Sequence, residues 1–251
     1  DTIVIIGGGA TSDIGGLAAA LLLRGVNWIV VPTTLLSMVD AAIGGKVAVN
    51  TTLGKNLIGS FHSPTKALYF DEFLETLPEE EMQSGLGEVL KYAFLDKNIA
   101  NYILETDNLL KSNFISLCAK YKTKITQLDF KEADQRKILN LGHTYGHAIE
   151  THLHLPHGQA VAYGLWIIIE LYAKEYRDEF ERFIAKLGIN LPPIQIDKQK
   201  IIELLRFDKK RDKANTIDII IPTDMGPEIK QVSMNSLEDK FNEIKFSRYI
   251  K

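Results

Sequence analysis

Three histidines and a glutamate form the pattern in this sequence that is best suited to chemistry. His143 and His147 are four residues apart in the run HTYGH, so a helix places both imidazoles on one face. His157 follows fourteen residues after His143, and Glu88 lies three residues before Lys91 in an earlier helical pattern. Two histidines and a carboxylate can hold zinc and leave a position open for water or substrate. The alternative is a set of structural histidines, since HTYGH lacks the glutamate of the HExxH motif.

A triplet of glycines near the start of the chain could bind a pyrophosphate. Gly7–Gly9 lies between the apolar run Ile3–Ile6 and a helical pattern, where backbone amides at a helix N-terminus can hold a phosphate group. The segment is not the dinucleotide fingerprint, because Ser12 takes its third glycine position and no acidic residue follows the next strand. A tight turn that binds nothing is the alternative.

Two lysines lie in a second glycine-rich region. Lys46 ends the run DAAIGGK that begins at Asp40, and Lys55 precedes Asn56 in LGKN. We expect a flexible loop here, in which the lysines act as point charges for a phosphate or a carboxylate. Ordinary surface lysines are the alternative.

A polar stretch precedes the histidines. Lys122, Glu132, Arg136 and Asn140 lie at places that fit a helix facing a polar cleft. The alternative is a solvated helix face with i,i+4 pairs such as Glu132–Arg136.

Composition narrows the class of protein. The 251 residues are 45% hydrophobic and 24% charged, and 29 basic against 32 acidic side chains give a net charge of −3. We therefore expect a cytoplasmic globular protein that binds no nucleic acid through bulk positive charge. The single cysteine, Cys118, excludes a disulfide scaffold. The longest apolar stretch, around 160–173, contains Glu170 and is too short to span a bilayer, so we expect no membrane partner.

The elements that would position these residues fall into two parts. Before residue 78, strand-like runs alternate with a helical pattern at Asp13–Arg24, which predicts a parallel α/β domain over 1–77. The predicted strands are Ile3–Ile6, Asn27–Val31 and Ala67–Phe70.

From Pro78 onward the pattern is mainly helical, which predicts a second domain over 78–251. A strand at Thr216–Pro222 and a turn at 225–227 add a small β-hairpin to it. The predicted helices are Glu80–Phe94, Ile99–Leu110, Phe114–Leu128, Lys137–Leu153 and Ala160–Leu187.

Three strands leave open edges and bury little surface in a parallel sheet. We therefore expect either a second chain or a further part of this domain to complete the sheet.

Taken together, the segments resemble the 3-dehydroquinate synthases of the sugar-phosphate cyclase group, in order along most of the chain. The matching runs are GGGATSDIGG (7–16), RGV (24–26), PTTLLSMVDAAIGGK (32–46), LGKNLIG (53–59), FLETLP (73–78), GLGEVLKY (85–92), RKILNLGHTYGHAIE (136–150), HGQAVAYG (157–164) and DKK (208–210).

The resemblance implies a Rossmann-like parallel-sheet domain followed by a helical metal-binding domain. It also implies a carbon–oxygen lyase of the shikimate pathway, which makes aromatic amino acids. Such an enzyme converts 3-deoxy-D-arabino-heptulosonate 7-phosphate into 3-dehydroquinate and phosphate. NAD and a divalent metal, zinc or cobalt, would be the cofactors, and NAD would return unchanged.

The resemblance also assigns roles to individual residues. It places the metal on Glu88, His143 and His157. The residues that would act in catalysis are Lys46, Lys91, Lys122, Arg136, Asn140 and His147. The residues that would bind the substrate are Arg24, Asp40, Lys55, Asn56, Lys122, Arg136, Asn140, His147 and Lys210. The residues that would bind NAD are Gly7, Gly8, Gly9, Asp13, Thr33, Thr34, Asp40, Lys46, Lys55, Phe73, Thr76, Leu77 and Glu81. Arg24 would act across the interface of a homodimer.

Three features depart from the family pattern. Gln159 stands where the family usually has glutamate, and the spacing from His143 to His157 is short. The family also has an α/β segment before the glycine triplet, so we expect the NAD-binding domain to be incomplete here. The alternatives are another cyclase such as 2-deoxy-scyllo-inosose synthase, a metal-dependent polyol dehydrogenase of the glycerol dehydrogenase type, and an inactive fragment that acts as a dimerisation or metal-binding module.

Overall fold

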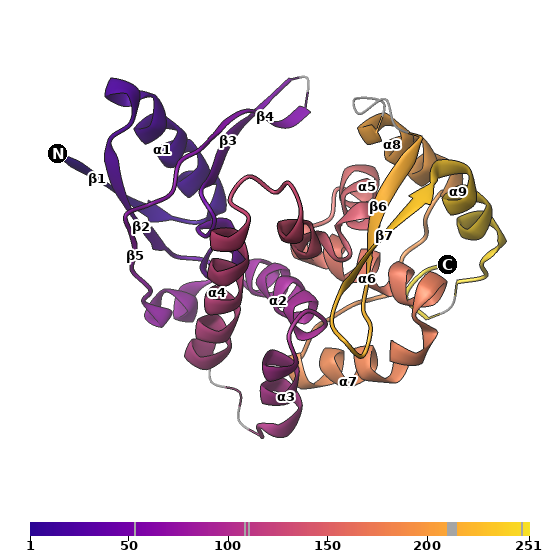
Figure 1. The fold of residues 1–251 in the computed structure, drawn as a ribbon. Coiled ribbons are helices and arrows are strands. Elements are labelled where there is room, and N and C mark those ends of the chain that lie inside the picture. The colour runs from indigo at the N-terminus through magenta and orange to yellow at the C-terminus, as the bar shows by residue number, and fades with distance from the viewer. Residues whose placement is uncertain (53, 108, 110, 210–214, 247) are drawn as a thin grey trace. The chain divides into compact units, whose positions relative to one another are not determined.

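The computed structural model describes residues 1–52, 54–107, 109, 111–209, 215–246 and 248–251 (Figure 1). The chain packs into two compact units. Unit 1 comprises residues 1–86 and 108–136, and unit 2 comprises residues 87–107 and 137–251. The domain boundary near residue 77 stays a prediction.

Unit 1 is built on a parallel sheet, as the sequence predicts. Strands β1 (Thr2–Gly7), β2 (Asn27–Pro32) and β5 (Lys66–Ala67) lie in the order β1-β2-β5, and both pairs are parallel. Helix α1 (Gly9–Leu21) covers one face of this sheet, where Ile5, Trp28 and Val30 are buried. The third strand is shorter than expected, because only Lys66 and Ala67 pair with β2.

The glycine-rich region with the two lysines is a β-hairpin, so the expectation of a flexible loop is wrong. Strand β3 (Lys46–Thr51) pairs antiparallel with β4 (Gly54–Phe61). Val47 on β3 is buried in the core that also contains Trp28. The sequence signal is weak because β4 is exposed along almost its whole length and shows no alternation of apolar and polar residues.

Short turns and one long helix complete unit 1. Helix α4 (Lys111–Leu128) is the long one. The turns are η1 (Leu22–Arg24), the π-helical η2 (Ser37–Ala41) and η3 (Asp71–Thr76). Helix α2 (Glu79–Ala93) contributes its first half to unit 1 and its second half to unit 2, and η4 (Gln135–Asn140) is divided in the same way.

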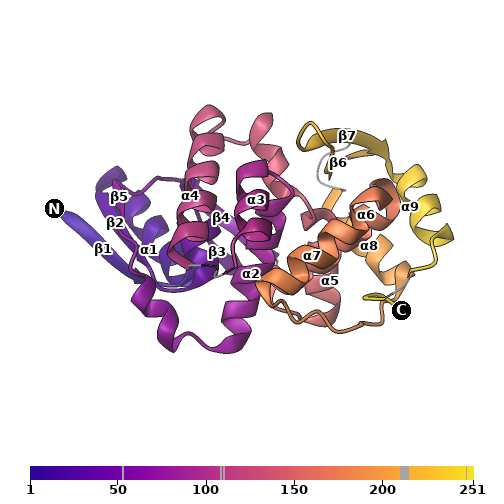
Figure 2. The ribbon, with the colours of Figure 1, turned by 90° about the horizontal axis from the view of Figure 1, so that it is seen from below.

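Unit 2 is mainly helical with one small hairpin, as predicted. Its strands β6 (Thr216–Ile221) and β7 (Glu228–Ser233) are antiparallel, and helix α9 (Met234–Glu243) directly follows β7 (Figure 2). The side chain of Ser233 caps this helix. The other helical elements are α3 (Lys97–Glu105), α5 (His143–Leu153), α6 (His157–Tyr172), η5 (Lys174–Tyr176), α7 (Arg177–Leu187) and α8 (Lys198–Lys209).

Helix α6 is the centre of unit 2. Thirteen of its sixteen residues are buried, and Trp166 packs against Phe180 and Tyr249 with ring centroids 5.1 Å away in both cases. The buried carboxylate of Glu170 accepts two hydrogen bonds of 2.6 Å from Arg177, which offsets the cost of its burial.

Two predicted helices are interrupted in the structure. The pattern over Lys137–Leu153 becomes η4 and α5, separated at Gly142, whose φ is +78°. The pattern over Ala160–Leu187 becomes α6 and α7, separated at Ala173, which has an extended φ of −148°. Buried residues flank the break at Gly142 on both sides, so hydropathy runs through it. The break at Ala173 is followed by exposed Lys174 and Glu175, where hydropathy falls. None of the helices in the described ranges has the length and hydropathy needed to cross a bilayer.

Candidate metal centre and anion-binding residues

Unit 2 brings Glu88, His143 and His157 together. The Nε2 atoms of His143 and His157 lie 3.5 Å and 3.4 Å from Oε1 of Glu88. One ligand atom from each residue lies within 4.8 Å of the others. The two histidines are the first residues of α5 and α6, and Glu88 lies on α2.

Close backbone packing places Glu88 beside His157. A Cβ atom on Gly87 would lie 2.0 Å from the carbonyl oxygen of Gly158, so only glycine lets α2 approach the first turn of α6 at this depth. A Cβ atom on Gly164 would lie equally close, 2.0 Å, to the carbonyl oxygen of Gly142. Glycines at these contacts therefore determine the spacing of the helices that carry the three side chains.

The second ring nitrogen of each histidine also has a partner. Nδ1 of His143 lies 3.1 Å from the carbonyl oxygen of Leu141, and Nδ1 of His157 lies 3.0 Å from Oε2 of Glu150. When each Nδ1–H donates to its oxygen, the lone pair of each Nε2 faces Glu88. This is the arrangement in which histidine binds a metal through Nε2.

Charge within this cluster is unevenly distributed. Glu88 is fully buried and its Oε2 lies 2.5 Å from Nζ of Lys91, which is 1% exposed. Burial lowers the pKa of His143 to about 3 despite the attraction of Glu88. Burial also opposes a charge on His157, but hydrogen bonds to Glu150 and Glu88 outweigh it and raise the pKa of His157 to about 10.

The donor set fits a divalent cation of the zinc or cobalt kind. Two imidazole nitrogens and one carboxylate oxygen are a known catalytic zinc set with an open fourth position. His147 is exposed, and its ring centroid lies 5.2 Å from that of His143 and 5.8 Å from that of His157. His147, Glu150 and His157 form a second group of residues with ligand atoms within 4.8 Å of one another.

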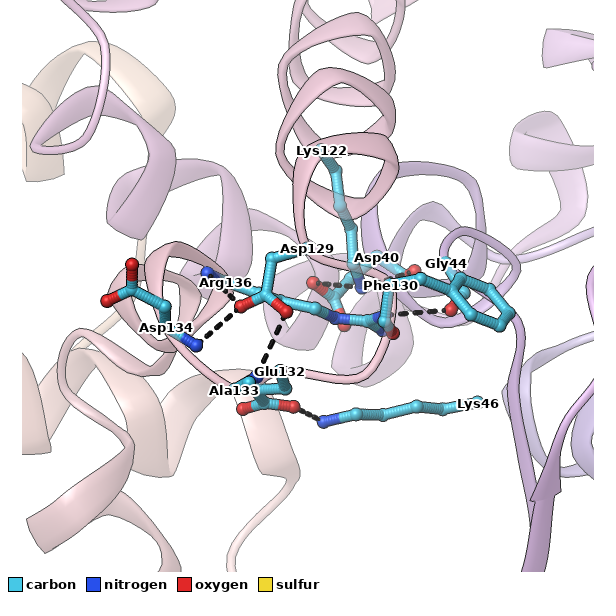
Figure 3. Close-up of polar contacts among 10 residues, drawn as sticks. All are labelled: Asp40, Gly44, Lys46, Lys122, Asp129, Phe130, Glu132, Ala133, Asp134 and Arg136. Atoms are coloured by element: carbon cyan, nitrogen blue, oxygen red, sulfur yellow. Dashed lines mark hydrogen bonds and ion pairs between the residues drawn. The ribbon is translucent and has the colours of Figure 1, made fainter.

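Unit 1 gathers three of the predicted cations (Figure 3). Lys122 on α4 donates to the backbone oxygen of Asp40 at 2.7 Å and pairs with its Oδ1 at 2.8 Å. Arg136 is 3% exposed and donates from Nη1 to the carbonyl oxygens of Gly44 and Phe130, at 3.0 Å and 2.6 Å. Lys46, at the start of β3, forms an ion pair with Glu132.

The loop after α4 presents Glu132 and Arg136. Asp129 accepts hydrogen bonds from the backbone amides of Ala133, Asp134 and Arg136, at 2.9, 2.7 and 3.1 Å, and so closes the loop on itself (Figure 3). These bonds lower the pKa of Asp129. Glu132 has a φ of +59°, so it is not part of a helix, and its carboxylate pairs with Lys46. The alternative interpretation, an i,i+4 pairing of Glu132 with Arg136 on a solvated helix face, is therefore wrong.

The electrostatics of these residues suit an anion. Partial burial, together with the nearby charges of Arg136 and Lys122, lowers the pKa of Lys46 to about 8. Burial raises the pKa of Asp13 to about 6 against the opposing effect of Lys122. Perturbed pKa values in opposite directions are frequent at functional sites.

The glycine triplet lies at the carboxyl ends of two neighbouring strands. Gly7 ends β1, Gly8 precedes the first turn of α1, and the amide of Thr33 after β2 donates to the carbonyl oxygen of Gly7 at 3.0 Å. The Thr34 hydroxyl accepts a hydrogen bond from the backbone amide of Ser37, with a length of 3.1 Å. In α/β folds ligands bind at this edge of a parallel sheet.

The remaining predicted residues are more dispersed. Lys55 and Asn56 lie beside the turn of the β3–β4 hairpin, whereas Lys46 lies at its open end. Arg24 ends η1 with a φ of +65°. Asn140 ends η4. Phe73, Thr76, Leu77 and Glu81 lie on or beside η3 and in the first turn of α2. Within the ranges that the structure describes, no hydrogen bond or ion pair joins those last four residues to Gly7–Gly9. Lys210 lies outside the described residues.

Sequence reasoning missed the roles of three acidic residues in these clusters: Glu132, which pairs with Lys46, Asp129, which closes its loop, and Glu150, which contacts His157. All three contacts depend on tertiary structure. The one available signal for Glu150 is its position on the same helix face as His143 and His147, seven and three residues before it along the helix.

Comparison with known proteins finds similar families and similar individual proteins. Family models of the 3-dehydroquinate synthase N-terminal and C-terminal regions match residues 1–84 and 85–211. The 3-dehydroquinate synthase of Prochlorococcus marinus is 37% identical over 263 aligned positions, which cover 96% of this chain and 71% of that protein. The enzyme of the same name from Francisella tularensis is 36% identical, with 94% and 71% covered.

Solved structures of related cyclases share the fold. A 2-deoxy-scyllo-inosose synthase complexed with carbaglucose-6-phosphate, NAD+ and Co2+ has a TM-score of 0.80 at 26% identity, covering 96% of this chain and 74% of that one. A 2-epi-5-epi-valiolone synthase from Streptomyces hygroscopicus with NAD+ and Zn2+ bound has a TM-score of 0.80 at 24% identity, with 96% and 72% covered.

Proposed function

The chain belongs to the 3-dehydroquinate synthase family. From this membership we propose how its residues carry out the 3-dehydroquinate synthase reaction. The chain is a lyase that converts 3-deoxy-D-arabino-heptulosonate 7-phosphate to 3-dehydroquinate and phosphate. The observation that carries the proposal is the convergence of Glu88, His143 and His157 in unit 2 of a chain that matches the family over nearly its whole length.

Glu88, His143 and His157 are the proposed ligands of zinc or cobalt. The nitrogen and oxygen donors, the orientation of both Nε2 atoms and the burial of Glu88 support this set. When bound, the metal supplies a Lewis acid for the substrate hydroxyl that is oxidised. Lys91 holds the second oxygen of Glu88, which leaves Oε1 toward the histidines.

NAD is the proposed second cofactor, and it supplies a hydride acceptor that is regenerated in the same turnover. Gly7–Gly9 and the N-terminus of α1 suit its pyrophosphate, with Thr33 and Thr34 at the adjacent strand end. The further residues proposed for this shell are Asp13, Asp40, Lys46, Lys55, Phe73, Thr76, Leu77 and Glu81.

The sugar phosphate is the proposed partner of the cationic residues. Lys46, Lys122 and Arg136 offer positive charge in unit 1, and an arriving anion competes with Glu132 for the ammonium group of Lys46. The further residues proposed to contact substrate are Arg24, Asp40, Lys55, Asn56, Lys91, Asn140, His147 and Lys210.

A homodimer in the cytoplasm is proposed as the working form, with Arg24 reaching the site of the partner subunit. Three exposed leucines precede Arg24, with relative exposures of 70% for Leu21, 52% for Leu22 and 82% for Leu23. Such a run of apolar side chains suits burial by a second copy. The single buried cysteine suits a reducing compartment.

Phosphate release from the heptulosonate phosphate tests the function. We expect release that needs both NAD and zinc, with no net NADH, and its loss in His143→Ala but not in His152→Ala. Accumulating NADH would instead indicate a polyol dehydrogenase, and turnover of glucose 6-phosphate would indicate an inosose synthase. Stoichiometric zinc binding without any release would contradict catalysis by this chain.

A further inference from the structure

His157 contacts a carboxylate at each ring nitrogen. Its Nε2 faces Oε1 of Glu88 at 3.4 Å, and its Nδ1 lies 3.0 Å from Oε2 of Glu150. Glu150 lies on α5, and its side chain is 14% exposed, so this carboxylate is largely shielded from water. The 3.0 Å distance is that of an N–H···O hydrogen bond, in which Nδ1 donates.

From this geometry we propose that Glu150 is a positioning residue that sets the metal affinity of the site through His157. The inference rests on the proposed ligand set, and Glu150 itself binds no metal in it. By accepting a hydrogen bond from Nδ1–H, the Glu150 carboxylate selects the tautomer whose Nε2 lone pair is directed at the metal position. It also fixes the ring plane and makes Nε2 a stronger donor.

His143 provides the internal comparison. Its Nδ1 lies 3.1 Å from a backbone carbonyl oxygen, that of Leu141, which the fold supplies whatever the side chain at that position. His157 begins α6 and obtains its acceptor from a side chain on α5. Both histidines therefore direct Nε2 at Glu88, but only the orientation of His157 depends on a side chain, which is charged and can be changed by mutation.

A second ion bound by His147, Glu150 and Nδ1 of His157 is the rival interpretation of the same residues. The direct contact of Nδ1 with Oε2 favours the hydrogen bond, because an ion between these two atoms would take the place of the proton that joins them. His147 is exposed, so water competes for its ring nitrogens. The two interpretations differ in stoichiometry, which is one ion or two ions per chain.

Zinc affinity, measured by competition with a chromophoric chelator, tests the inference. We expect Glu150→Ala to weaken zinc binding about 10- to 100-fold, the range for loss of such a partner of a ligand. Glu150→Gln retains an oxygen acceptor and should recover most of this loss. The control is Glu105→Gln, an exposed residue of unit 2, which should bind zinc as the unaltered protein does. The visible spectrum of the cobalt-loaded protein should change in Glu150→Ala and not in the control.

A double-mutant cycle separates an effect through His157 from a general one. In a His157→Ala background, Glu150→Ala should cause no further loss of zinc affinity. The role of Glu150 would be overturned if Glu150→Ala caused the same loss of zinc affinity in the His157→Ala background as in the unaltered protein. It would also be overturned if Glu150→Ala alone left the zinc affinity unaltered, or if it reduced the number of bound zinc ions per chain from two to one. Metal-free circular dichroism spectra that match across the variants show that folding is retained.

The failure of the ligand set itself gives a different result. An unaltered protein that binds no zinc, or a His143→Ala variant that binds it normally, contradicts the proposed metal centre and this inference with it. Normal, His143-dependent binding that is insensitive to Glu150 contradicts the inference alone.

Discussion

The charge of Lys46 changes within the pH range in which enzymes are usually assayed. Its pKa is lowered to about 8, so its ammonium group is present below that pH and is lost as the pH rises through it. Anion binding that depends on Lys46 must therefore weaken in alkaline solution. The ion pair with Glu132 is lost over the same range, because a neutral amine no longer attracts the carboxylate.

We predict that the affinity for sulfate, which keeps its charge across this range, falls between about pH 7 and pH 9, on either side of the lowered pKa of Lys46. Lys46→Arg should abolish the fall, because a guanidinium stays protonated there. Isothermal titration calorimetry at several pH values measures the sulfate affinity. The control is Lys66→Arg, an exposed residue of β5, which should leave the fall in affinity unchanged. An equal fall in the Lys46→Arg variant would assign the titration to another group.

The histidines of the proposed metal set are visible in the sequence because histidine is rare and they lie close together along the chain, whereas the family resemblance is what assigns Glu88 to the set. The run HTYGH by itself indicates two histidines on one helix face. Glu132 and Glu150 are not visible in this way, since glutamate is common and each contact joins separate elements: the loop after α4 with β3, and α5 with α6. The sequence and its family resemblance predict the proposed ligands, and tertiary structure shows which residues contact them.

At the scale of elements, the contact of α2 with α6 determines whether the metal set forms. Gly87→Ala places a methyl group 2.0 Å from the carbonyl oxygen of Gly158, and backbone atoms cannot yield as a flexible side chain can. We predict a loss of about 1–3 kcal/mol in unfolding free energy and a weaker zinc affinity, as the helices separate. Urea denaturation and zinc titration measure the two effects.

Glu80→Ala on the exposed face of the same helix is the matched control and should change neither quantity. Normal zinc binding by Gly87→Ala would mean that α2 can approach α6 in another way, and that this glycine does not position Glu88.

The elements themselves differ in how well their sequences reveal them. β1 and β2 are continuous apolar runs and are predicted almost to the residue, although Val4 and Ile6 of β1 are exposed. Helix α4 is predicted from Phe114 onward. β4 has no buried face, so no alternation marks it. The break at Ala173 separates the almost wholly buried α6 from Lys174 and Glu175, which are exposed, so it coincides with a change in burial. Hydropathy therefore does not reveal a strand such as β4 that lacks a buried face.

At the scale of the molecule, metal binding should stabilise one unit more than the other, because all three proposed ligands lie in unit 2. Zinc at about 100 times its dissociation constant stabilises the binding-competent fold by about 2.7 kcal/mol. We predict that hydrogen exchange slows in α5 and α6 on addition of zinc, while exchange in β1 and β2 changes little. Equal slowing in both units would contradict a site confined to unit 2.

The two units also interrupt one another along the chain, and this has a consequence for synthesis on the ribosome. Residues 87–107 belong to unit 2, yet α4 of unit 1 follows them. An emerging chain that stops before residue 108 therefore has no complete set of partners for either unit, although domains usually fold in order from the N-terminus. Unit 1 can close only when α4 has left the exit tunnel, so residues 1–107 must stay soluble with their apolar faces uncovered, and chaperones that bind nascent apolar segments would have their main target there.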